Sequence, residues 1–201
     1  MNNGVILVVS GPAGSGKGTV CKILRESGDF VISVSRTTRA PRPGEIDGSD
    51  YIFVTKEEFK KYLAEDDFLE YNEYCGEFYG TPRRLAEETV ASGKNLILEI
   101  DVNGAAQVKK KCPEAVLVML LPPSYSEQER RLRTRGTETE EKIQKRLAQA
   151  KIEMESIGTY DYIVYNYTGE TEAAASRLRA IAEAEKSSVK RMPNAKTEYF
   201  K

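Results

Sequence analysis

The segment VILVVSGPAGSGKGT, at residues 5–19, constrains this chain more than any other feature. A short aliphatic run leads into G-x-x-x-x-G-K, formed by Gly11, Gly16 and Lys17. Glycines let the main chain curl closely around an anion, and the next helix directs its unpaired N–H groups and positive dipole end toward it. Lys17 adds a full charge that can reach the outer phosphates. The segment therefore predicts a phosphate-binding loop and a site for a nucleoside triphosphate.

The context of this loop favours a ligand site over a glycine-rich turn that binds nothing, which is the alternative. Val20, Ile23 and Leu24 fall at helical spacing after the loop, so the order strand, loop, helix is present. One position departs from the common pattern, because Gly18 stands where Ser or Thr usually offers a hydroxyl to magnesium. We therefore expect Mg²⁺ to be held through water and the phosphates, with Thr19 or Asp101 as candidate protein ligands.

Composition narrows the chemistry further. The chain has 201 residues, 40% of them hydrophobic, and a formal net charge of −1, which predicts one globular domain and does not suggest a nucleic-acid partner. It contains no histidine, which excludes Ser-His-Asp and Cys-His catalysis but suits phosphoryl transfer. Its three cysteines show no metal-ligand spacing. The longest apolar run, 116–121, is too short to span a bilayer and no signal-peptide layout is present, so we expect a cytoplasmic protein without a membrane or protein partner.

Apolar runs that alternate with helical patterns predict a parallel sheet covered on both faces. The expected strands lie at residues 5–9, 30–34, 96–100, 116–121 and 162–165. In such sheets ligands bind beyond the carboxyl ends of the strands. The phosphate loop, Asp101 and Asn166 each follow an expected strand, so they should meet at one edge.

Two regions depart from this alternation. Residues 36–81 are rich in Pro, Gly and Arg, with strand-like pieces near 51–54 and 68–74 and a helix over 56–64, which predicts an inserted, partly antiparallel subdomain. After Pro122-Pro123 come two helices. Thr137 or Thr139 could cap the second of them, and Ile143, Leu147, Ala150, Met154 and Ile157 would form its apolar stripe. A helix over 171–190 and a polar tail complete the chain.

Arginines and carboxylates supply candidate ligand groups. Arg36, Arg39 and Arg42 lie near Tyr51 in a loop-like stretch, where they could hold a second phosphate or form a solvated basic loop. A second group consists of Arg130, Arg131, Arg133, Arg135 and Arg146. This group fits either a solvated helical face or a mobile lid that brings positive charge to a transferring phosphoryl group. Glu70, Glu99 and Asp101 are the carboxylates of interest, although Asp101 could simply cap a helix.

Several segments together resemble one family. They are, in chain order, SGPAGSGKGT, SVSRTTRAPRPGEIDGSDYIFV, DFLEYNEYCGEFYGT, LILEIDVNGA, LLPPS, RLRTRGTETEEKIQKRL and the late strand ending at Asn166. In these segments the chain resembles the guanylate kinase family over nearly its whole length. Tyr167 departs from the family, which often has Asp there, as Gly18 does in the phosphate loop.

The resemblance implies a three-layer α/β P-loop kinase fold with a central parallel sheet. It divides a single domain, 1–190, into a core (1–34, 82–124 and 151–190), an inserted GMP-binding subdomain (35–81) and a helical lid (125–150), followed by a polar tail, 191–201. It also implies phosphorylation of GMP, and of dGMP, by ATP with Mg²⁺, giving ADP and GDP.

The resemblance further implies roles for individual residues. The implied catalytic residues are Lys17, Arg42, Arg135 and Arg146. The implied ATP-binding residues are Gly11, Gly14, Ser15, Gly16, Lys17, Gly18, Thr19, Arg131 and Asn166. The implied GMP-binding residues are Ser35, Arg39, Arg42, Tyr51, Glu70, Tyr79, Thr81 and Asp101.

Base chemistry agrees with a guanine site. Guanine exposes two N–H donors, and the ionised carboxylates of Glu70 and Asp101 only accept, whereas adenine would present an acceptor to them. The competing interpretations are a kinase for another nucleotide such as AMP, suggested by the K-G-T sequence, and a scaffold module of the guanylate-kinase-like type that binds peptides without catalysis. The intact loop around Lys17 and the lid arginines argue against such a module.

Overall fold

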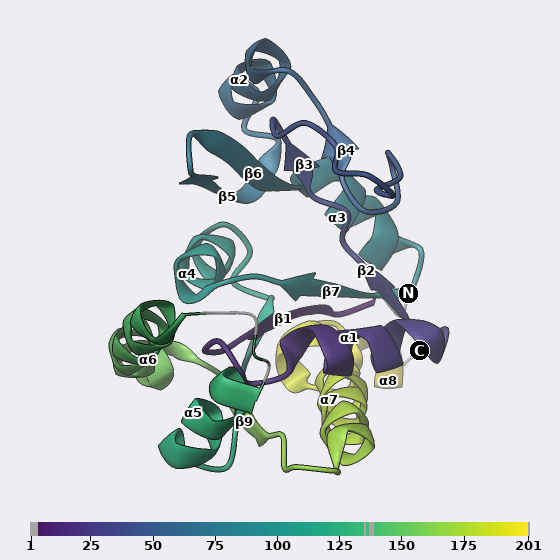
Figure 1. Cartoon of the computed structure of the whole chain (residues 1–201). Helices are drawn as coiled ribbons and strands as arrows, with labels where there is room; N and C mark the ends of the chain where they lie inside the picture. Colours follow the sequence, from purple (N-terminus) through teal and green to yellow (C-terminus); the bar gives the residue numbers. More distant parts are fainter. Residues whose placement is uncertain (1–3, 135, 137–138, 201) are drawn as a thin grey trace.

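The computed structural model describes residues 4–134, 136 and 139–200, and its centre is a five-stranded sheet (Figure 1). The strands are β1 (Ile6–Ser10), β2 (Phe30–Ile32), β7 (Asn95–Glu99), β8 (Val116–Leu121) and β9 (Tyr162–Tyr165), in the order β2-β7-β1-β8-β9. All four neighbouring pairs run parallel, which confirms the predicted sheet. The second strand ends at Ile32, two residues earlier than predicted.

Alternating side chains of β1 build two separate cores. Leu7 and Val9 face α1 (Lys17–Glu26) and α7 (Thr171–Lys186), in a cluster with Val20, Leu24 and Leu178. Ile6 and Val8 face the opposite side, where α3 (Arg83–Ala91) and α4 (Val102–Lys111) cover the sheet. Because every residue of β1 is buried, its apolar sequence is that of a central strand in a three-layer fold.

A second, four-stranded sheet lies beside the first (Figure 1). Its strands are β3 (Arg36–Thr37), β4 (Ile52–Phe53), β5 (Phe68–Tyr74) and β6 (Glu77–Pro82), in the order β4-β3-β6-β5. Only β3 and β4 pair in parallel. The helix α2 (Lys56–Ala64) has the predicted bounds, because Thr55 and Glu58 form a capping box. Phe59 of α2 stacks on Phe68, with ring centroids 4.4 Å apart, and thereby anchors the helix to the sheet.

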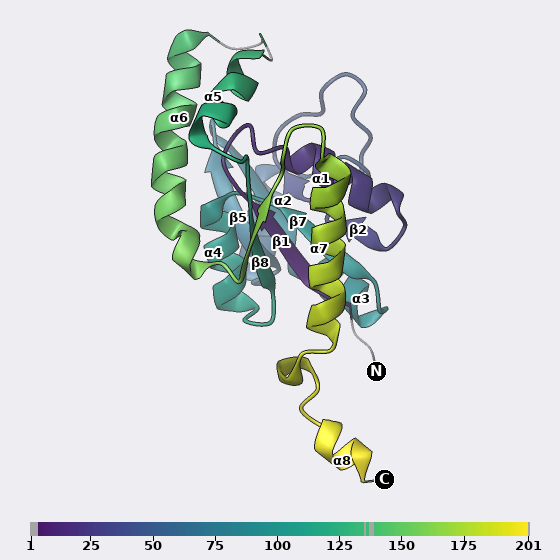
Figure 2. The ribbon, with the colours of Figure 1, turned by 90° about the horizontal axis from the view of Figure 1, so that it is seen from below.

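The two helices after Pro123 are α5 (Tyr125–Thr134) and α6 (Glu140–Glu155), which pack against each other (Figure 2). Leu132, Ile143 and Leu147 form their apolar contact, together with Ala13 of the phosphate loop. The predicted apolar stripe of α6 is correct through Ala150 but not at Met154, which is 36% exposed. Thr139 is at the N-cap position but its side chain makes no capping hydrogen bond, and Thr137 lies outside the described residues.

The C-terminal segment differs from its prediction. Helix α7 ends at Lys186 and is followed by two short helices, η2 (Val189–Arg191) and α8 (Ala195–Tyr199), that project from the body (Figure 2). Tyr199 and Phe200 are exposed there, so the tail is not uniformly polar. A further short helix, η1 (Ser156–Thr159), joins α6 to β9. Within the described residues, no helix is long and apolar enough to cross a membrane.

Candidate active site

The phosphate loop joins β1 to α1, and its glycines serve packing as well as anion binding. Gly11 has φ +149°, and a Cβ at this position would lie 2.1 Å from the main-chain oxygen of Leu120 in β8. Gly16 has φ +90°, and its Cβ would lie 2.3 Å from Asn166 Nδ2. Both positions therefore require glycine, because other residues would collide with a neighbouring segment as well as strain the backbone.

Lys17 begins α1 and lies within the loop. Its Nζ donates to the main-chain oxygens of Gly11 and Pro12. Burial lowers the pKa of Lys17, while Glu99 is the foremost of the carboxylates that oppose this shift. The ammonium group is thus held against main-chain carbonyl oxygens of the loop, with the charge of Glu99 nearby.

Asn166 ties the end of β9 to this loop. Its Nδ2 donates to the main-chain oxygen of Ser15, 2.9 Å away, and its main-chain oxygen accepts from Arg131 Nη2 at 2.8 Å. Arg131 Nη1 also donates to the main-chain oxygen of Gly14, 3.4 Å away. Thr19, Arg131 and Asn166 are the predicted ATP-binding residues that line one pocket. The contacts of Asn166 and Arg131 bring Ser15 and Gly14 next to it. Two buried atoms of this group, Ser15 Oγ and Asn166 Oδ1, have no protein partner among the described residues.

A second pocket, of about 320 Å³, opens near the carboxyl end of β7. Its lining includes Ser35, Tyr51, Glu70, Tyr79 and Asp101, and Thr81 lines an adjoining pocket. Most of the residues predicted to bind GMP therefore meet here, although they come from both sheets and the segments between them. The volume is in the range of small-molecule sites.

Glu70 is the most buried carboxylate of this pocket, at 6% exposure. Its Oε1 accepts a hydrogen bond of 2.6 Å from Thr81 Oγ1. Burial raises the pKa of Glu70, and the Thr81 hydrogen bond opposes that shift, while the nearby charge of Asp101 adds to it. The pocket thus contains a carboxylate whose charge is unfavourable to bury and whose oxygens can accept hydrogen bonds.

Asp101 caps a helix, which is one role that its sequence position suggested, and it also lines the pocket. Its Oδ1 accepts from the main-chain N–H of Gly104 at 2.8 Å and so caps α4. Its Oδ2 remains toward the pocket, 3.5 Å from Asn72 Nδ2. The cap fixes the Asp101 side chain through Oδ1 and leaves Oδ2 on the side of the pocket.

The loop between β3 and β4 carries Arg39 and Arg42. Arg39 Nη2 donates to both carboxylate oxygens of Glu45, at 2.8 and 3.0 Å, and its guanidinium lies 5.5 Å from the ring centroid of Tyr51. The main-chain N–H of Arg42 donates to Glu45 as well, and the Arg42 side chain is exposed. Tyr51 and Tyr79 are in edge-to-face contact, with ring centroids 6.0 Å apart. Glu45 therefore organises the loop that presents both arginines.

Arg36, which the sequence grouped with Arg39 and Arg42 as a candidate for a second phosphate or a solvated basic loop, does not share this arrangement. Its Nη1 donates to Asp67 at 2.8 Å, and its guanidinium stacks on Tyr62, 3.8 Å from the ring centroid. The side chains of Arg36 and Asp67 are only 12% and 3% exposed. Arg36 thus belongs to the packing of the second sheet.

The predicted lid arginines differ in their contacts. Arg133 pairs with Glu129 in its own helix and with Glu140 of α6. Arg146 is exposed on α6, and Arg135 lies outside the described residues. The ion pairs of Arg133 join α5 to α6 at their surface.

Glu99, which the sequence named as a carboxylate of interest without assigning it a ligand, also lies in this region. It lines both pockets near β7 and lies 3.6 Å, through its Oε1, from where a Cβ of Gly18 would be. Burial raises the pKa of Glu99, and Lys17 opposes the shift. The only signal in the sequence was a charge at the end of an otherwise apolar strand. Thr19, by contrast, lines the pocket with Arg131 and not the one that Asp101 lines.

A glycine-rich phosphate loop at the edge of a parallel sheet, near a second pocket rich in carboxylates and tyrosines, defines the class of P-loop nucleotide kinases. The sequence model of the guanylate kinase family matches residues 3–185, and the chain belongs to this family. It is accordingly an enzyme, a kinase.

Individual relatives agree with this assignment. The guanylate kinase of Desulfitobacterium hafniense is 47% identical over 96% of each chain. That of Halalkalibacterium halodurans is 49% identical over 90% of this chain and 89% of its own. The crystal structure of guanylate kinase from Anaplasma phagocytophilum has a TM-score of 0.73 at 36% identity, covering 95% of this chain and 90% of that one.

Proposed function

We propose that this chain carries out its family's reaction by binding two nucleotides at one edge of the central sheet. The γ-phosphoryl group of ATP is transferred to GMP, giving ADP and GDP. The observation that carries this proposal is the pair of carboxylates Glu70, which is buried, and Asp101, which is exposed, in a pocket separate from the phosphate loop. A pocket with these carboxylates, separate from the phosphate loop, fits the acceptor nucleotide of a kinase.

The acceptor pocket suits guanine and its phosphate. The N1–H and exocyclic amine of guanine donate to Glu70 and Asp101, while Ser35 and Thr81 supply hydroxyls that can donate or accept. Arg39, Arg42, Tyr51 and Tyr79 bind the phosphate of GMP. Because recognition acts on the base and the phosphate, dGMP is a second acceptor.

The donor site uses the phosphate loop. Main-chain N–H groups from Gly14 to Thr19 and the Lys17 ammonium bind the phosphates of ATP, as the loop geometry supports. Arg131 and Asn166 lie beside the rest of that nucleotide. The unpartnered Oδ1 of Asn166 is an acceptor suited to an exocyclic amine such as that of adenine.

The transfer itself needs no protein nucleophile. An ionised phosphate oxygen of GMP attacks the γ-phosphorus in line, and the bond from that phosphorus to the bridging oxygen of ADP breaks. Lys17, Arg42, Arg135 and Arg146 stabilise the charge that spreads over the transferring group. Residues 35–81 and 125–150 close over the two nucleotides and keep water away.

Magnesium fits this site as an ion held mainly by phosphates and water. Bound Mg²⁺ neutralises phosphate charge and orients the reacting groups. No cluster of three His, Cys, Asp or Glu suited to a metal exists among the described residues, and Gly18 offers no hydroxyl. Glu99 and Asp101 are the carboxylates suited to hold its water shell. Thr19 is the weaker candidate because it lines the other pocket.

We also propose that the domain spans residues 1–190, with 191–201 outside it, and that it works in the cytoplasm. The three cysteines are free, as suits a reducing compartment.

A panel of acceptors tests the proposed function. The purified chain, with Mg²⁺ and ATP, is offered GMP, dGMP, AMP, CMP, UMP and dTMP in a coupled assay that measures ADP. We expect turnover with GMP and dGMP only. A preference for any other acceptor would overturn the assignment of Glu70 and Asp101 to guanine. Absence of ATP binding by calorimetry would instead favour a peptide-binding module.

A further inference from the structure

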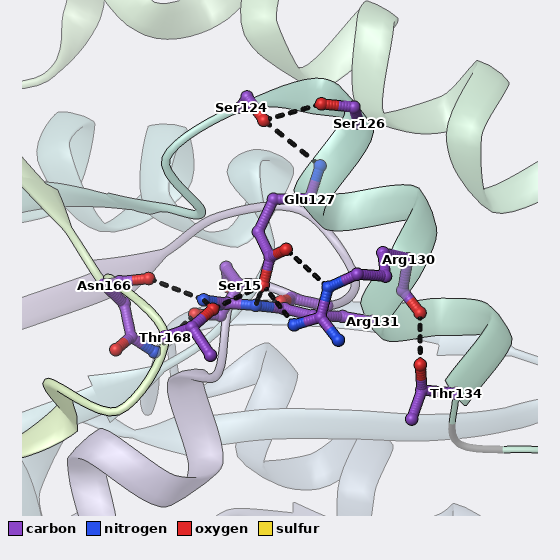
Figure 3. Close-up of polar contacts among 10 residues, drawn as sticks. Ser15, Ser124, Ser126, Glu127, Arg130, Arg131, Thr134, Asn166 and Thr168 are labelled. Carbon is purple, nitrogen blue, oxygen red and sulfur yellow. Dashed lines mark hydrogen bonds and ion pairs between the residues drawn. The ribbon is translucent and has the colours of Figure 1, made fainter.

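Glu127 of α5 accepts hydrogen bonds from three side chains, and the proposed reaction gives Glu127 itself no role (Figure 3). Its carboxylate accepts from Arg130 Nε and Nη2, both at 2.7 Å, from Arg131 Nε at 2.8 Å and from Thr168 Oγ1 at 2.5 Å. These four donors hold the pKa of Glu127 below its usual range. The helix start is fixed too, because the main-chain N–H of Glu127 donates to Ser124 Oγ.

Every nitrogen of the Arg131 guanidinium donates a hydrogen bond. Nε donates to Glu127, Nη1 donates to the main-chain oxygen of Gly14, and Nη2 donates to the main-chain oxygen of Asn166 and to Thr168 Oγ1. Arg131 thereby joins α5 to the phosphate loop and to the segment after β9. With four of its five N–H donors engaged, the guanidinium is fixed in one plane, and its faces and one Nη1 hydrogen remain for a ligand.

Glu127 differs from an ordinary surface ion-pair residue in two ways. Its side chain is 16% exposed, whereas Glu129, which pairs with Arg133 on the same helix, is 35% exposed. Its hydrogen bond to Thr168 joins residues 41 apart in sequence, while the Glu129 contact with Arg133 stays within one helical turn. Exposed pairs within a helix contribute little, so Glu129 provides a matched comparison.

We propose that Glu127 is a positioning residue for the donor nucleotide: it fixes the plane of Arg131 and fastens the segment around Thr168 beside the same pocket. The inference rests on the proposed role of Arg131 in ATP binding. Arg131 and Thr168 line that pocket together with Thr19 and Asn166, so a base or ribose bound there depends on their relative placement. Glu127 acts through its neighbours and is not assigned a contact with ATP.

The test compares Glu127→Gln with Glu129→Gln, which remove the same charge from the same helix. Steady-state kinetics give KM for ATP, KM for GMP and kcat, and thermal unfolding without nucleotide checks the fold. We expect Glu127→Gln to raise KM for ATP about tenfold, the effect of losing a charged hydrogen bond, with kcat and KM for GMP within about threefold. Glu129→Gln should leave all three unchanged.

Thr168→Val supplies an independent variant, because it removes the contacts of the Thr168 hydroxyl with Glu127 and Arg131 while Arg131 can still donate to the main-chain oxygen of Asn166. It should raise KM for ATP about threefold and add less than that in the Glu127→Gln background, since the two residues act through one contact. Equal KM values for ATP in Glu127→Gln and Glu129→Gln, or equal losses for ATP and GMP, would overturn the proposal. If Glu127→Gln fails to fold, an unchanged KM for ATP in Thr168→Val overturns it. Activity of the unaltered chain on GMP is measured separately, so this failure is distinguishable from failure of the proposed function.

Discussion

Replacing Glu70 by Gln should weaken acceptor binding and stabilise the protein at the same time. The two side chains have nearly the same shape, and Thr81 Oγ1 can donate to the new carbonyl as it does to Glu70 Oε1. What changes is the charge, which sits at 6% exposure next to Asp101. Removing it takes away a charged acceptor for guanine but also removes the cost of burying that charge.

The size of the binding effect follows from the hydrogen bonds involved. A hydrogen bond to a charged group contributes about 1.5–3 kcal/mol, and about 1.4 kcal/mol corresponds to a factor of ten. Glu70→Gln should therefore raise KM for GMP about 10- to 100-fold. KM for ATP should stay close to its original value, because Glu70 lines the acceptor pocket and not the one with Arg131.

The stability effect has a definite pH dependence. Burial raises the pKa of Glu70 in the folded state above its ordinary value of 4.5, so the folded state binds this proton more tightly than the unfolded state. The stability that protonation confers is fully present below about pH 4.5 and is lost as pH rises through the folded pKa. Glutamine does not titrate. The Tm of Glu70→Gln should thus exceed that of the unaltered protein by an amount that grows with pH and then levels.

Two measurements test this reasoning. Initial rates at varied GMP and fixed saturating ATP give the binding effect, and thermal unfolding from pH 4 to pH 8 gives the stability difference. An unchanged KM for GMP would refute the proposed guanine contact. A variant that becomes less stable relative to the unaltered protein as pH rises would refute the assignment of a buried, costly charge.

Three further perturbations separate chemistry from packing. Lys17→Ala should lower kcat by about two orders of magnitude or more with little change in Tm, and an unchanged rate would remove Lys17 from catalysis. Gly11→Ala should cost at least about 2 kcal/mol in urea unfolding, whereas Gly28→Ala, with no atom within 4 Å of its Cβ, should cost about 1 kcal/mol, so equal losses would contradict the close approach. Asp67→Ala should cost about 3 kcal/mol because it leaves Arg36 buried without its partner, while KM for GMP stays the same; a large rise in that KM would restore Arg36 to the phosphate site.

Sequence patterns predicted those features of the fold whose causes are local. The phosphate loop depends on spacing within a few residues, and α2 begins where Thr55 and Glu58 can cap each other, so both were found at their observed positions. The parallel sheet followed from apolar runs long enough to be buried on both faces. The two-residue strand β3 (Arg36–Thr37) shows no such pattern, because its pairing with β6 is decided by residues more than 40 positions away.

Side-chain roles followed the same division. Asp101 and Glu70 were selected by motif, and both reach the acceptor pocket. Arg36 was grouped with Arg39 by its spacing, but its role is set by Asp67, which lies 31 residues further along the chain. The spacing of Glu127 from Arg130 and Arg131 suggests only ordinary ion pairs within a helix, because its contact with Thr168 joins residues 41 apart in sequence.

The contact of Ala13 with Leu132, Ile143 and Leu147 connects the phosphate loop to the helices α5 and α6. The helices α5 and α6 pack on the loop through this contact, so the proposed closure of 125–150 would involve the loop that we propose to bind the phosphates of ATP. A larger side chain at Ala13 would push α5 and α6 away from the phosphate loop. We therefore expect such a substitution to change the rate at which ADP is released.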